Sequence, residues 1–397
     1  MSITDTDAEL DAAAKQDMSN PTKTVFWLAG ENSGDLHASL VMHKLNEEIP
    51  FIKHIGIGGN RMKAEGLQQL YPFERFAVMG FVEVIKHLGF FLKVEREIKR
   101  VLIRQKPDLV VLVDYPGLNL RIAKMADDMG IDVLYFIAPQ FWAWKHKRVF
   151  KLRENTRHVA CILPFEQELL SIHNITSTYV GHPIAEEINY EHDRNSFARF
   201  YGLDPDKKWL GFFPGSRNNE VEKLLPIYLQ TINKLDADRY QFLFSKARSV
   251  SHSLYTQMID YYAKTRPFII DGFNYEMMKF CDFLTIKSGT TTLEAAYIGT
   301  PAVIVYVANR LSYEIGKRFV KLDKIGLPNI ILEKKVLPEL IQHEVNPDNI
   351  GFHINNFLAD KELYSQTKAE LRKIHNLLGD RVASVETVKI IREMLKI

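Results

Sequence analysis

Two glycine turns in the second half of the sequence have the composition of a phosphate-binding loop. Each lies between an apolar run and a helical stretch, where free backbone N–H groups and the positive end of the helix dipole favour an anion. The first turn adds an arginine, which can donate two hydrogen bonds to one phosphate. The residues concerned are Gly215, Ser216 and Arg217 in the first turn, and Ser288, Gly289 and Thr290 in the second.

Glu294 follows the second turn by about one helical turn. A carboxylate there can accept hydrogen bonds from both hydroxyls of a ribose, so the two turns together predict a site for a nucleoside diphosphate. A simpler interpretation stays open for each turn. Arg217 would then be a surface residue at a capped helix start, and Thr291 or Thr292 would cap the second helix, with Glu294 as a favourably placed acid.

A single acid, Asp114, ends the apolar run of the stretch PDLVVLVDYP (107–116) in the first half. At the carboxyl end of a buried strand, an acid acts as a general base or caps the following helix, and both interpretations stay open. Trp144 lies farther along, where aromatic residues alternate with Lys, His and Arg. Such a stretch can stack on a sugar or bind an anionic head group, although tryptophan is as often a core residue.

A third glycine turn, in WLAGENSGDLHAS (27–39), lies between a strand at 25–28 and a helix at 36–48. This is the position of a nucleotide loop in the first half. Its carboxylates, Glu31 and Asp35, would repel a diphosphate. We therefore expect Glu31, Ser33 and Asp35 to face the sugar or the acceptor, with the acids toward hydroxyl groups.

Residues 73–103 carry apolar side chains at helical spacing, and the last third of this segment is rich in Lys and Arg. The ordinary interpretation is a helix that faces the core. The alternative is an apolar surface with a basic rim, which lies on an anionic membrane or receives acyl chains. The residues proposed for that contact are Phe81, Val84, Ile85, Leu88, Phe90 and Phe91.

The composition is that of an ordinary globular protein, with 397 residues, 46% hydrophobic and 25% charged, and a net charge of +2. The basic excess is too small to predict a nucleic-acid partner. Cys161 and Cys281 form no metal or redox spacing, which fits a reducing cytoplasm. No apolar run reaches the roughly 18 residues of a transmembrane helix. We expect no signal peptide, because the start of the sequence is acidic.

Alternating strands and helices must position these residues. From residue 24 onward, short apolar runs alternate with amphipathic stretches, a βαβ pattern that predicts parallel sheets with helices on both faces. The expected fold class is α/β, with two Rossmann-like domains facing across a ligand-binding cleft. A polar stretch at 184–208 is expected to connect them. The expected divisions are a disordered leader at 1–23, an N-terminal domain at 24–188 joined by a C-terminal helix at about 380–397, and a C-terminal domain at 189–379.

With these pieces in order, the chain resembles the lipid-A-disaccharide synthase family, which are glycosyltransferases of the GT-B fold. The resemblance runs from about Val25 to the C-terminus. Several of its motifs are weak singly, but ten in register are highly specific. They are AGENSGDLH, GIGGNRM, VMGFVEVI, DYPGLN, APQFWAWKHKRV, LPFE, VGHP, PGSRNNEV, SGTTTLE and LPNIIL with LPELIQ.

The resemblance implies transfer of a 2,3-diacylglucosamine from UDP-2,3-diacylglucosamine to 2,3-diacylglucosamine 1-phosphate (lipid X). The product would be the β-1,6-linked disaccharide of the lipid A pathway, formed with inversion at the anomeric carbon and release of UDP. The acyl chains imply a cytoplasmic enzyme that is peripherally associated with the inner membrane, with the segment at 76–92 in contact with it.

The resemblance also implies roles for individual residues. Asp114 matches the family's acid and would be the base for the acceptor 6-hydroxyl, and Arg217 would bind the UDP diphosphate. Asn329 matches an asparagine expected to face the donor. Four residues match the motif for phosphate and ribose: Ser288, Gly289, Thr290 and Glu294.

One departure from the family pattern concerns the base. Many relatives have a second acid three residues after the first, whereas this chain has Gly117 and Leu118. If that acid matters, Asp114 acts alone. None of the motifs quoted above contains a DxD-like metal-binding cluster, so neither a metal nor another cofactor is expected.

Two alternatives to this function stay open. One is another UDP-sugar enzyme of the same fold, such as a 2-epimerase or a polyprenyl-linked sugar transferase. The other is a membrane-associated protein that binds a nucleotide-sugar or lipid without turnover. The helical C-terminal segment (356–397) returns to the first domain or exchanges with a second subunit, which would form a homodimer.

Overall fold

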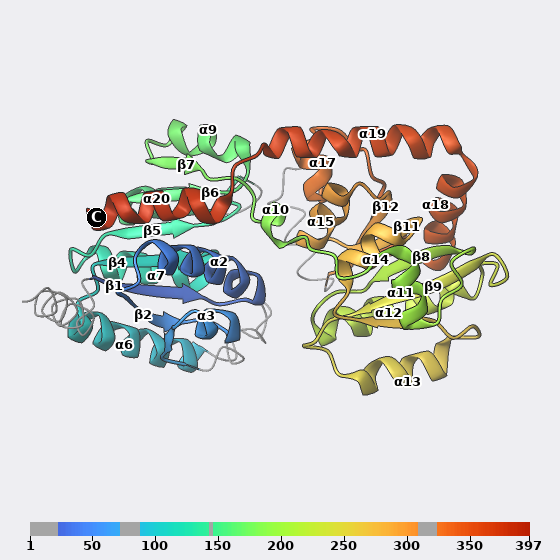
Figure 1. Ribbon diagram of the computed structural model, residues 1–397, viewed down its shortest axis with the longest axis horizontal. Helices are drawn as coiled ribbons and strands as arrows, with labels where there is room; N and C mark the ends of the chain where they lie inside the picture. Colours follow the sequence, from blue (N-terminus) through green and yellow to red (C-terminus); the bar gives the residue numbers. More distant parts are fainter. Residues whose placement is uncertain (1–22, 72–87, 143–145, 309–323) are drawn as a thin grey trace, which may run out of the picture. The chain divides into compact units, whose positions relative to one another are not determined.

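The computed structural model describes residues 23–71, 88–142, 146–308 and 324–397, which form two compact units. Unit 1 contains the chain up to Pro183 together with Arg381–Ile397, and unit 2 contains Ile184–Asp380. Each unit is a parallel β-sheet with helices packed on it (Figure 1). The α/β fold class expected from the sequence is confirmed.

Unit 1 has a parallel sheet whose described strands run in the order β3-β2-β1-β4-β5-β6-β7. All five residues of β4 (LVVLV) are buried, because helices cover both faces of the sheet. The strands are β1 (Lys23–Ala29), β2 (Ile52–Ile57), β3 (Gln68–Gln69), β4 (Leu109–Val113), β5 (Val133–Phe136), β6 (His158–Cys161) and β7 (Ser177–Tyr179). The helices are α2 (Asn32–Glu48), α3 (Asn60–Ala64), α6 (Leu88–Gln105), α7 (Pro116–Asp127), α8 (Arg148–Asn155), α9 (Pro164–Ile172) and α20 (Ala383–Leu395).

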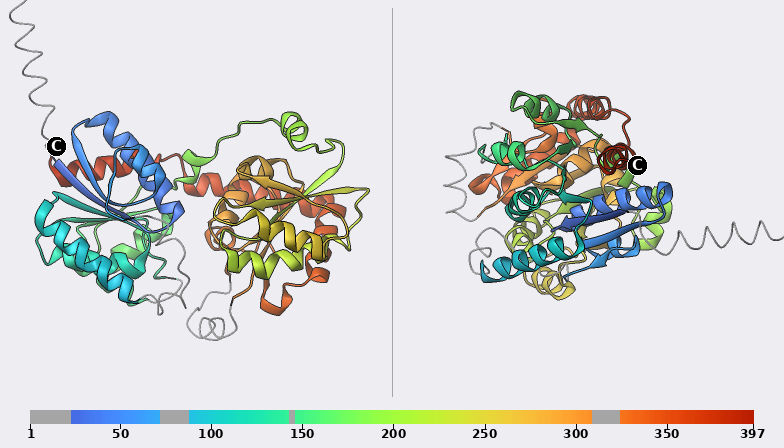
Figure 2. Two further views of the ribbon diagram at one scale, coloured as in Figure 1. Left: turned by 90° about the horizontal axis from the view of Figure 1, so that it is seen from below. Right: turned by 90° about the vertical axis from the view of Figure 1, so that its left-hand side faces the viewer.

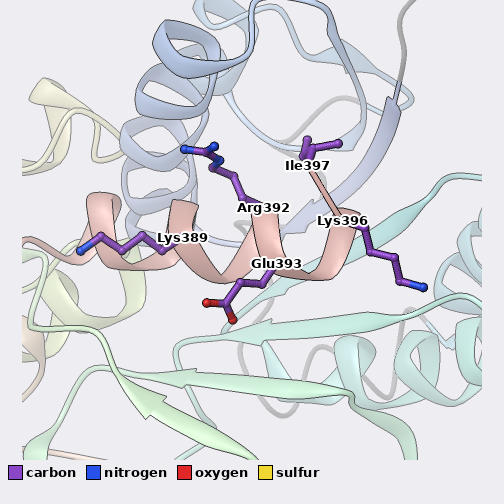
Figure 3. A pocket seen from close by; sticks show the side chains of 5 residues that line it. All are labelled: Lys389, Arg392, Glu393, Lys396 and Ile397. Carbon is purple, nitrogen blue, oxygen red and sulfur yellow. The ribbon is translucent and has the colours of Figure 1, made fainter.

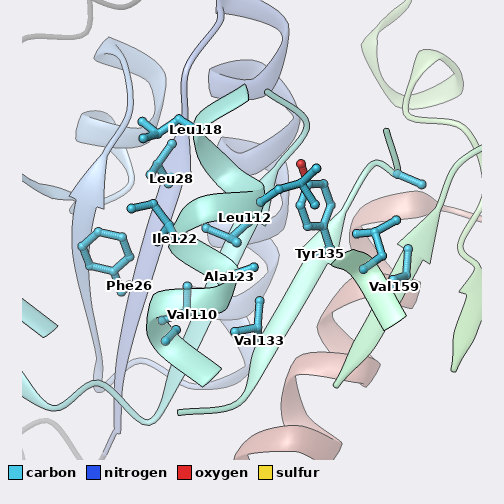
Figure 4. Close-up of a cluster of buried hydrophobic side chains, with 14 of the residues drawn as sticks. Phe26, Leu28, Val110, Leu112, Leu118, Ile122, Ala123, Val133, Tyr135 and Val159 are labelled. Carbon is cyan, nitrogen blue, oxygen red and sulfur yellow. The ribbon is translucent and has the colours of Figure 1, made fainter. Parts of the chain in front are cut away.

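Helices cover both faces of this sheet (Figure 1, Figure 2), and two hydrophobic clusters fill the space between the sheet and these helices. Figure 4 shows part of the first, in which Leu28 of β1 lies close to Leu118 at the start of α7. In the second, α2 packs with α20, and Arg392 pairs with Glu48 at 3.0 Å. The C-terminal helix therefore returns to unit 1 after the whole of unit 2. An exchange of this helix between two copies stays a prediction.

Unit 2 has a second parallel sheet, with its described strands in the order β10-β9-β8-β11-β12-β13. The strands are β8 (Lys208–Phe213), β9 (Tyr240–Lys246), β10 (Phe268–Asp271), β11 (Phe283–Lys287), β12 (Ala302–Tyr306) and β13 (Glu339–Ile341). The helices are α10 (Ile184–Glu187), α11 (Arg194–Tyr201), α12 (Asn218–Ile232), α13 (His252–Tyr262), α14 (Asn274–Phe280), α15 (Thr290–Ile298), α17 (Leu327–Ile331), α18 (Pro347–Ala359) and α19 (Lys361–Leu378), with a 3-10 turn at Gln342–Glu344.

The segment at 184–208 is more structured than the connection expected from its polar composition. It contains α10 and α11, and both belong to unit 2. The start of α11 is capped by Asp193, whose carboxylate accepts a hydrogen bond from the Ser196 backbone N–H at 2.7 Å. Polar residues there form a helix cap rather than an irregular linker.

In each sheet the strand order reverses at one place among the described strands, between β1 and β4 in unit 1 and between β8 and β11 in unit 2. Ligands of open α/β sheets bind beyond the carboxyl ends of the strands at such a point. Asp114 directly follows β4, and the turns at 214–217 and 288–290 directly follow β8 and β11. The residues predicted to act in chemistry therefore lie at the switch point of their own sheet.

Candidate active site

Asp114 and Tyr115 form the turn from β4 into α7, and both have a left-handed backbone conformation (φ 45° and 43°). This conformation is uncommon for residues with a side chain and persists where neighbours over-determine it. Here the Asp114 N–H donates to the Phe136 carbonyl at 3.0 Å. Its own carbonyl accepts from the Asn119 amide at 2.7 Å and from the Tyr135 hydroxyl at 2.6 Å. Tyr115, not Asp114, takes the N-cap position of α7, so the capping interpretation of Asp114 is not supported.

The Asp114 carboxyl is partly buried, and its charge environment is mixed. Burial, followed by the nearby Glu31 carboxylate, raises the pKa of Asp114 to about 7, while His37 and Arg148 act in the opposite direction. Burial in turn lowers the pKa of the Arg148 guanidinium. A carboxyl with a pKa near neutrality suits a general base that works near pH 7.

Other polar residues near Asp114 had no role assigned from the sequence. Glu166 is 1% exposed and accepts hydrogen bonds from the Trp142 indole at 3.1 Å and the Leu163 backbone N–H at 3.2 Å. Burial raises the pKa of Glu166 to about 7. His182 is also buried, and burial together with His37 lowers its pKa to about 3, which keeps its ring neutral.

These residues could have been found from their motifs. Asn119, Glu166 and His182 stand in DYPGLN, LPFE and VGHP, which are quoted above for the resemblance. The sequence does not show that these side chains are buried. A buried polar side chain indicates a specific role, whereas an exposed Asn, Glu or His does not.

The glycine turn after β1 differs from the expected arrangement. The helix α2 begins at Asn32 rather than near residue 36, so Glu31 is its N-cap and Ser33 lies in its first turn. The crowded glycine of this turn is Gly30, where an added Cβ would lie 2.6 Å from the Tyr115 ring, whereas an added Cβ on Gly34 would be in ordinary contact with the Ala29 side chain at 3.4 Å. Glu31 stays a candidate on the acceptor side, because its charge raises the pKa of Asp114 and the two carboxyl groups are therefore close.

Asp35 has a structural role in place of the one expected from its charge. It is 6% exposed, and its carboxylate accepts hydrogen bonds from backbone N–H groups at 59, 61 and 62, at 2.6 to 3.2 Å. These groups begin α3, which makes Asp35 a cap supplied by a distant segment. We therefore correct the expectation that Asp35 faces acceptor hydroxyls.

The two phosphate-suited turns of unit 2 lie next to each other because β8 and β11 are neighbouring strands. Arg217 is the N-cap of α12 and is half-buried rather than fully exposed. Gly289 is the N-cap of α15, and the Thr292 hydroxyl donates back to its carbonyl at 2.7 Å. The expected cap at Thr291 or Thr292 is therefore two or three positions too late. In the described structure, neither N-cap makes a side-chain capping bond.

One carboxylate links these two turns. Glu220, in the first turn of α12, accepts a hydrogen bond from the Ser216 N–H at 3.1 Å and pairs with the Lys287 ammonium at 2.9 Å. Gly215 has φ 119°, and an added Cβ would lie 2.4 Å from the Glu220 carboxylate. The turn therefore requires glycine at this position for both its backbone conformation and its space.

Glu294 lies one turn inside α15 and is partly buried. Burial, followed by the charge of Glu187, raises the pKa of Glu294 to about 7. A second acid, Glu187 of α10, therefore lies near the Glu294 carboxyl, and the role of Glu294 toward a ribose stays a prediction.

Asn329 does not have the surroundings of a ligand-facing residue. It is 0% exposed, and its amide donates to the Leu337 carbonyl and to the Glu339 carboxylate, both at 2.8 Å. Its oxygen accepts from the backbone N–H groups at 336 and 337, each at 2.9 Å. We therefore correct the expectation that Asn329 faces the donor. It ties α17 to the residues that lead into β13, and the Glu339 carboxylate also accepts from the Ile325 N–H, whose carbonyl accepts a hydrogen bond from Ser288.

Of the six residues proposed for acyl contact, Phe81, Val84 and Ile85 lie outside the described residues, and the side chains of Leu88 and Phe91, in the first turn of α6, also lie outside them. Trp144, expected on the sugar or acceptor side, lies outside the described residues as well. Phe90 is half-buried against the core of unit 1, with its ring edge-on to Tyr71 and 6.4 Å between centroids. For Phe90 the core interpretation is the one supported.

A shallow hollow on α20 is lined by Lys389, Arg392, Glu393, Lys396 and Ile397 (Figure 3). The charge of Glu393 acts to raise the pKa of His158, the first residue of β6, so Glu393 lies near the amino end of that strand. Asp114 follows the carboxyl end of β4, so the hollow lies at the opposite end of the parallel sheet. It is not a candidate active site. Within the described ranges, no helix is long and apolar enough to cross a membrane, and no three His, Cys, Asp or Glu side chains are grouped to hold a metal.

The family model described as lipid-A-disaccharide synthetase matches residues 25–391. The lipid-A-disaccharide synthase of Geobacter metallireducens is 36% identical over 380 residues, which cover 94% of this chain and 98% of that protein. The corresponding protein of Nitrosococcus oceani is 36% identical over 365 residues, covering 91% and 94%.

Solved structures share the fold at low identity. A UDP complex of S. aureus MnaA has a TM-score of 0.65 and 12% identity, covering 94% of this chain and 97% of its own. Acinetobacter baumannii MurG has a TM-score of 0.56 and 14% identity, covering 94% and 99%. The expected GT-B fold and the family resemblance are both confirmed. The chain belongs to the lipid-A-disaccharide synthase family and is a glycosyltransferase of lipid A biosynthesis.

Proposed function

We propose that the enzyme transfers 2,3-diacylglucosamine from UDP to the 6-hydroxyl of 2,3-diacylglucosamine 1-phosphate, giving the β-1,6-linked disaccharide 1-phosphate and UDP. Family membership supports the reaction class. The observation that carries the assignment of the base is the Asp114 carboxyl, which follows β4 and has a pKa of about 7. Unit 1 supplies the base and binds the acceptor, and unit 2 binds the donor.

Asp114 is the general base of this proposal. The acceptor 6-oxygen attacks the anomeric carbon on the face opposite the diphosphate, and Asp114 takes the hydroxyl proton as the bond to UDP breaks. One bond forms and one breaks, so the anomeric configuration inverts. Hydrogen bonds from Asn119 and Tyr135 to the Asp114 carbonyl hold the backbone from which the carboxyl projects.

The departing diphosphate gathers negative charge, which unit 2 is suited to stabilise. Arg217 and the N–H groups that begin α12 and α15 supply positive charge and hydrogen bonds. Gly215, Ser216, Ser288, Gly289 and Thr290 form the turns that present these groups, and Glu294 accepts from the ribose. Asn329 acts indirectly, by fixing the segment that contacts Ser288.

The acyl chains of both substrates place the enzyme at the cytoplasmic face of the inner membrane. The helix α6 begins with apolar residues and then exposes Lys93, Arg96, Lys99 and Arg100. Exposed cations of this kind are attracted to anionic lipid. The segment at 76–92 would supply the apolar contact that accompanies this attraction.

The direct test is incubation with UDP-2,3-diacylglucosamine and 2,3-diacylglucosamine 1-phosphate in detergent micelles or anionic vesicles. We expect disaccharide 1-phosphate and UDP in equal amounts by mass spectrometry. Omission of the acceptor is expected to stop UDP release. Folded protein that forms no disaccharide, or that converts the donor to its 2-epimer instead, would contradict the proposal.

A further inference from the structure

The ion pair of Glu220 and Lys287 joins the two nucleotide turns of unit 2. We propose that Lys287 is a second cation for the diphosphate of the donor, and that Glu220 occupies the place of a phosphate until the donor binds. This inference rests on the proposed donor site and adds two residues to it.

Lys287 is positioned for this role by the end of its strand. It is the last residue of β11, and Ser288 follows it directly. Its side chain is 27% exposed, and an added Cβ on Gly289 would lie 3.9 Å from its ammonium. The ammonium therefore lies over the turn at 288–290, where a second phosphate group would have to be neutralised.

Glu220 uses the donors that a phosphate would use. One carboxylate oxygen accepts from the Ser216 N–H, and the other pairs with the Lys287 ammonium. Backbone N–H groups at a helix start, together with a lysine, form a typical phosphate-binding set. The carboxylate also fills the space above Gly215, where an added Cβ would meet it at 2.4 Å. Glu220 thus satisfies this set in the absence of a ligand.

Binding of a diphosphate then exchanges one anion for another. The donor displaces the Glu220 carboxylate toward solvent, and its phosphate oxygens take the Ser216 N–H and the Lys287 ammonium. Because Glu220 competes with the phosphate for the Ser216 N–H and the Lys287 ammonium, it weakens donor binding. It also keeps the Lys287 ammonium paired with an anion before the donor binds. A purely structural ion pair, which only holds the two turns together, would instead strengthen donor binding.

The sign of the Glu220→Gln effect separates these interpretations. Titration of the full-length protein with UDP is expected to give severalfold tighter binding to E220Q than to the wild type, because the neutral amide competes less well. Lys287→Met is expected to weaken UDP binding about tenfold or more, as for loss of a charged hydrogen bond. Lys287→Arg should restore most of the affinity.

Matched controls come from the same helix. Lys223→Met and Glu222→Gln change the same charges at exposed positions of α12 and are expected to leave UDP binding unchanged. Binding of uridine, measured by competition with UDP, should not respond to K287M or E220Q, because uridine lacks the diphosphate. Weaker UDP binding to E220Q, or an equal loss for UDP and uridine, would overturn the inference in favour of a structural pair.

Failure of the donor site itself gives a different result. Wild-type protein that does not bind UDP would contradict the proposed function. Wild-type protein that binds UDP, together with K287M that binds it equally well, would overturn only the role of Lys287.

Discussion

The Asn119 side-chain amide donates a hydrogen bond to the Asp114 carbonyl at 2.7 Å, and Asn119 is 0% exposed. The same nitrogen lies 3.1 Å from the Val113 carbonyl. A buried amide therefore bridges the end of β4 and the start of α7 exactly where the backbone turns left-handed. Backbone strain of this kind is retained at functional sites when the surroundings impose it.

Asn119→Leu is expected to lower the free energy of unfolding by about 1–3 kcal/mol, because it removes a buried amide that donates to the Asp114 carbonyl and leaves that carbonyl with the Tyr135 hydroxyl as its side-chain donor. It should also lower kcat, while UDP binding by unit 2 is unaffected. Urea unfolding, turnover and UDP titration measure the three quantities. Asn155→Leu is the matched control, since Asn155 is also buried and donates to a backbone carbonyl at 2.8 Å. If both variants lose stability but N119L keeps full turnover, Asn119 does not position the base.

Asp114→Asn is expected to stabilise the fold at alkaline pH. Because burial raises the pKa of Asp114 to about 7, the folded protein binds this proton more tightly than the unfolded chain, in which the pKa is near 3.8. The contribution of this proton to the free energy of unfolding is fully present below about pH 4 and is lost as the pH rises through about 7. Because the side chain is partly exposed, solvent reduces this effect. We expect the free energy of unfolding of D114N to exceed that of the wild type by about 1–3 kcal/mol near pH 8 and to equal it near pH 4. A difference that does not grow with pH would contradict the raised pKa.

Glu31→Gln is expected to move the acid limb of the rate profile to lower pH. Glu31 raises the pKa of Asp114, and its removal lets the base ionise at a lower pH. The measurement is kcat between about pH 5 and 9. Glu47→Gln, at an exposed position of the same helix, should leave the midpoint in place. A midpoint that moves upward in E31Q would show that Glu31 does not act on the base through its charge.

Asn329→Ala is expected to act mainly on stability. It removes a buried side chain that makes hydrogen bonds through both its nitrogen and its oxygen, and we expect a loss of about 2–4 kcal/mol. Arg217→Ala should change stability by less than about 0.5 kcal/mol and weaken UDP binding instead. Unfolding and UDP titration are measured on both variants. An N329A protein of normal stability that no longer binds UDP would restore the donor-facing role.

The positions of candidate functional residues were predicted best where those residues directly follow an apolar run of the sequence. Asp114 and Arg217 lie at the strand ends where the sequence predicted them, because strand ends and glycine turns are visible as local patterns. Asp35 and Asn329 were misassigned because their partners are backbone groups of other segments, which residue type does not disclose. The pairing of Glu220 with Lys287 depends on β8 and β11 being neighbours, and strand order is set by packing across the whole sheet.

The most direct test of the account is a single-turnover reaction of Asp114→Asn with both lipid substrates, with UDP binding measured on the same preparation. We expect UDP binding within twofold of the wild type and product formation about 10²–10⁴-fold slower, the usual contribution of a general base. D114N that binds UDP normally and forms disaccharide at the wild-type rate would contradict the assignment of Asp114 as the base.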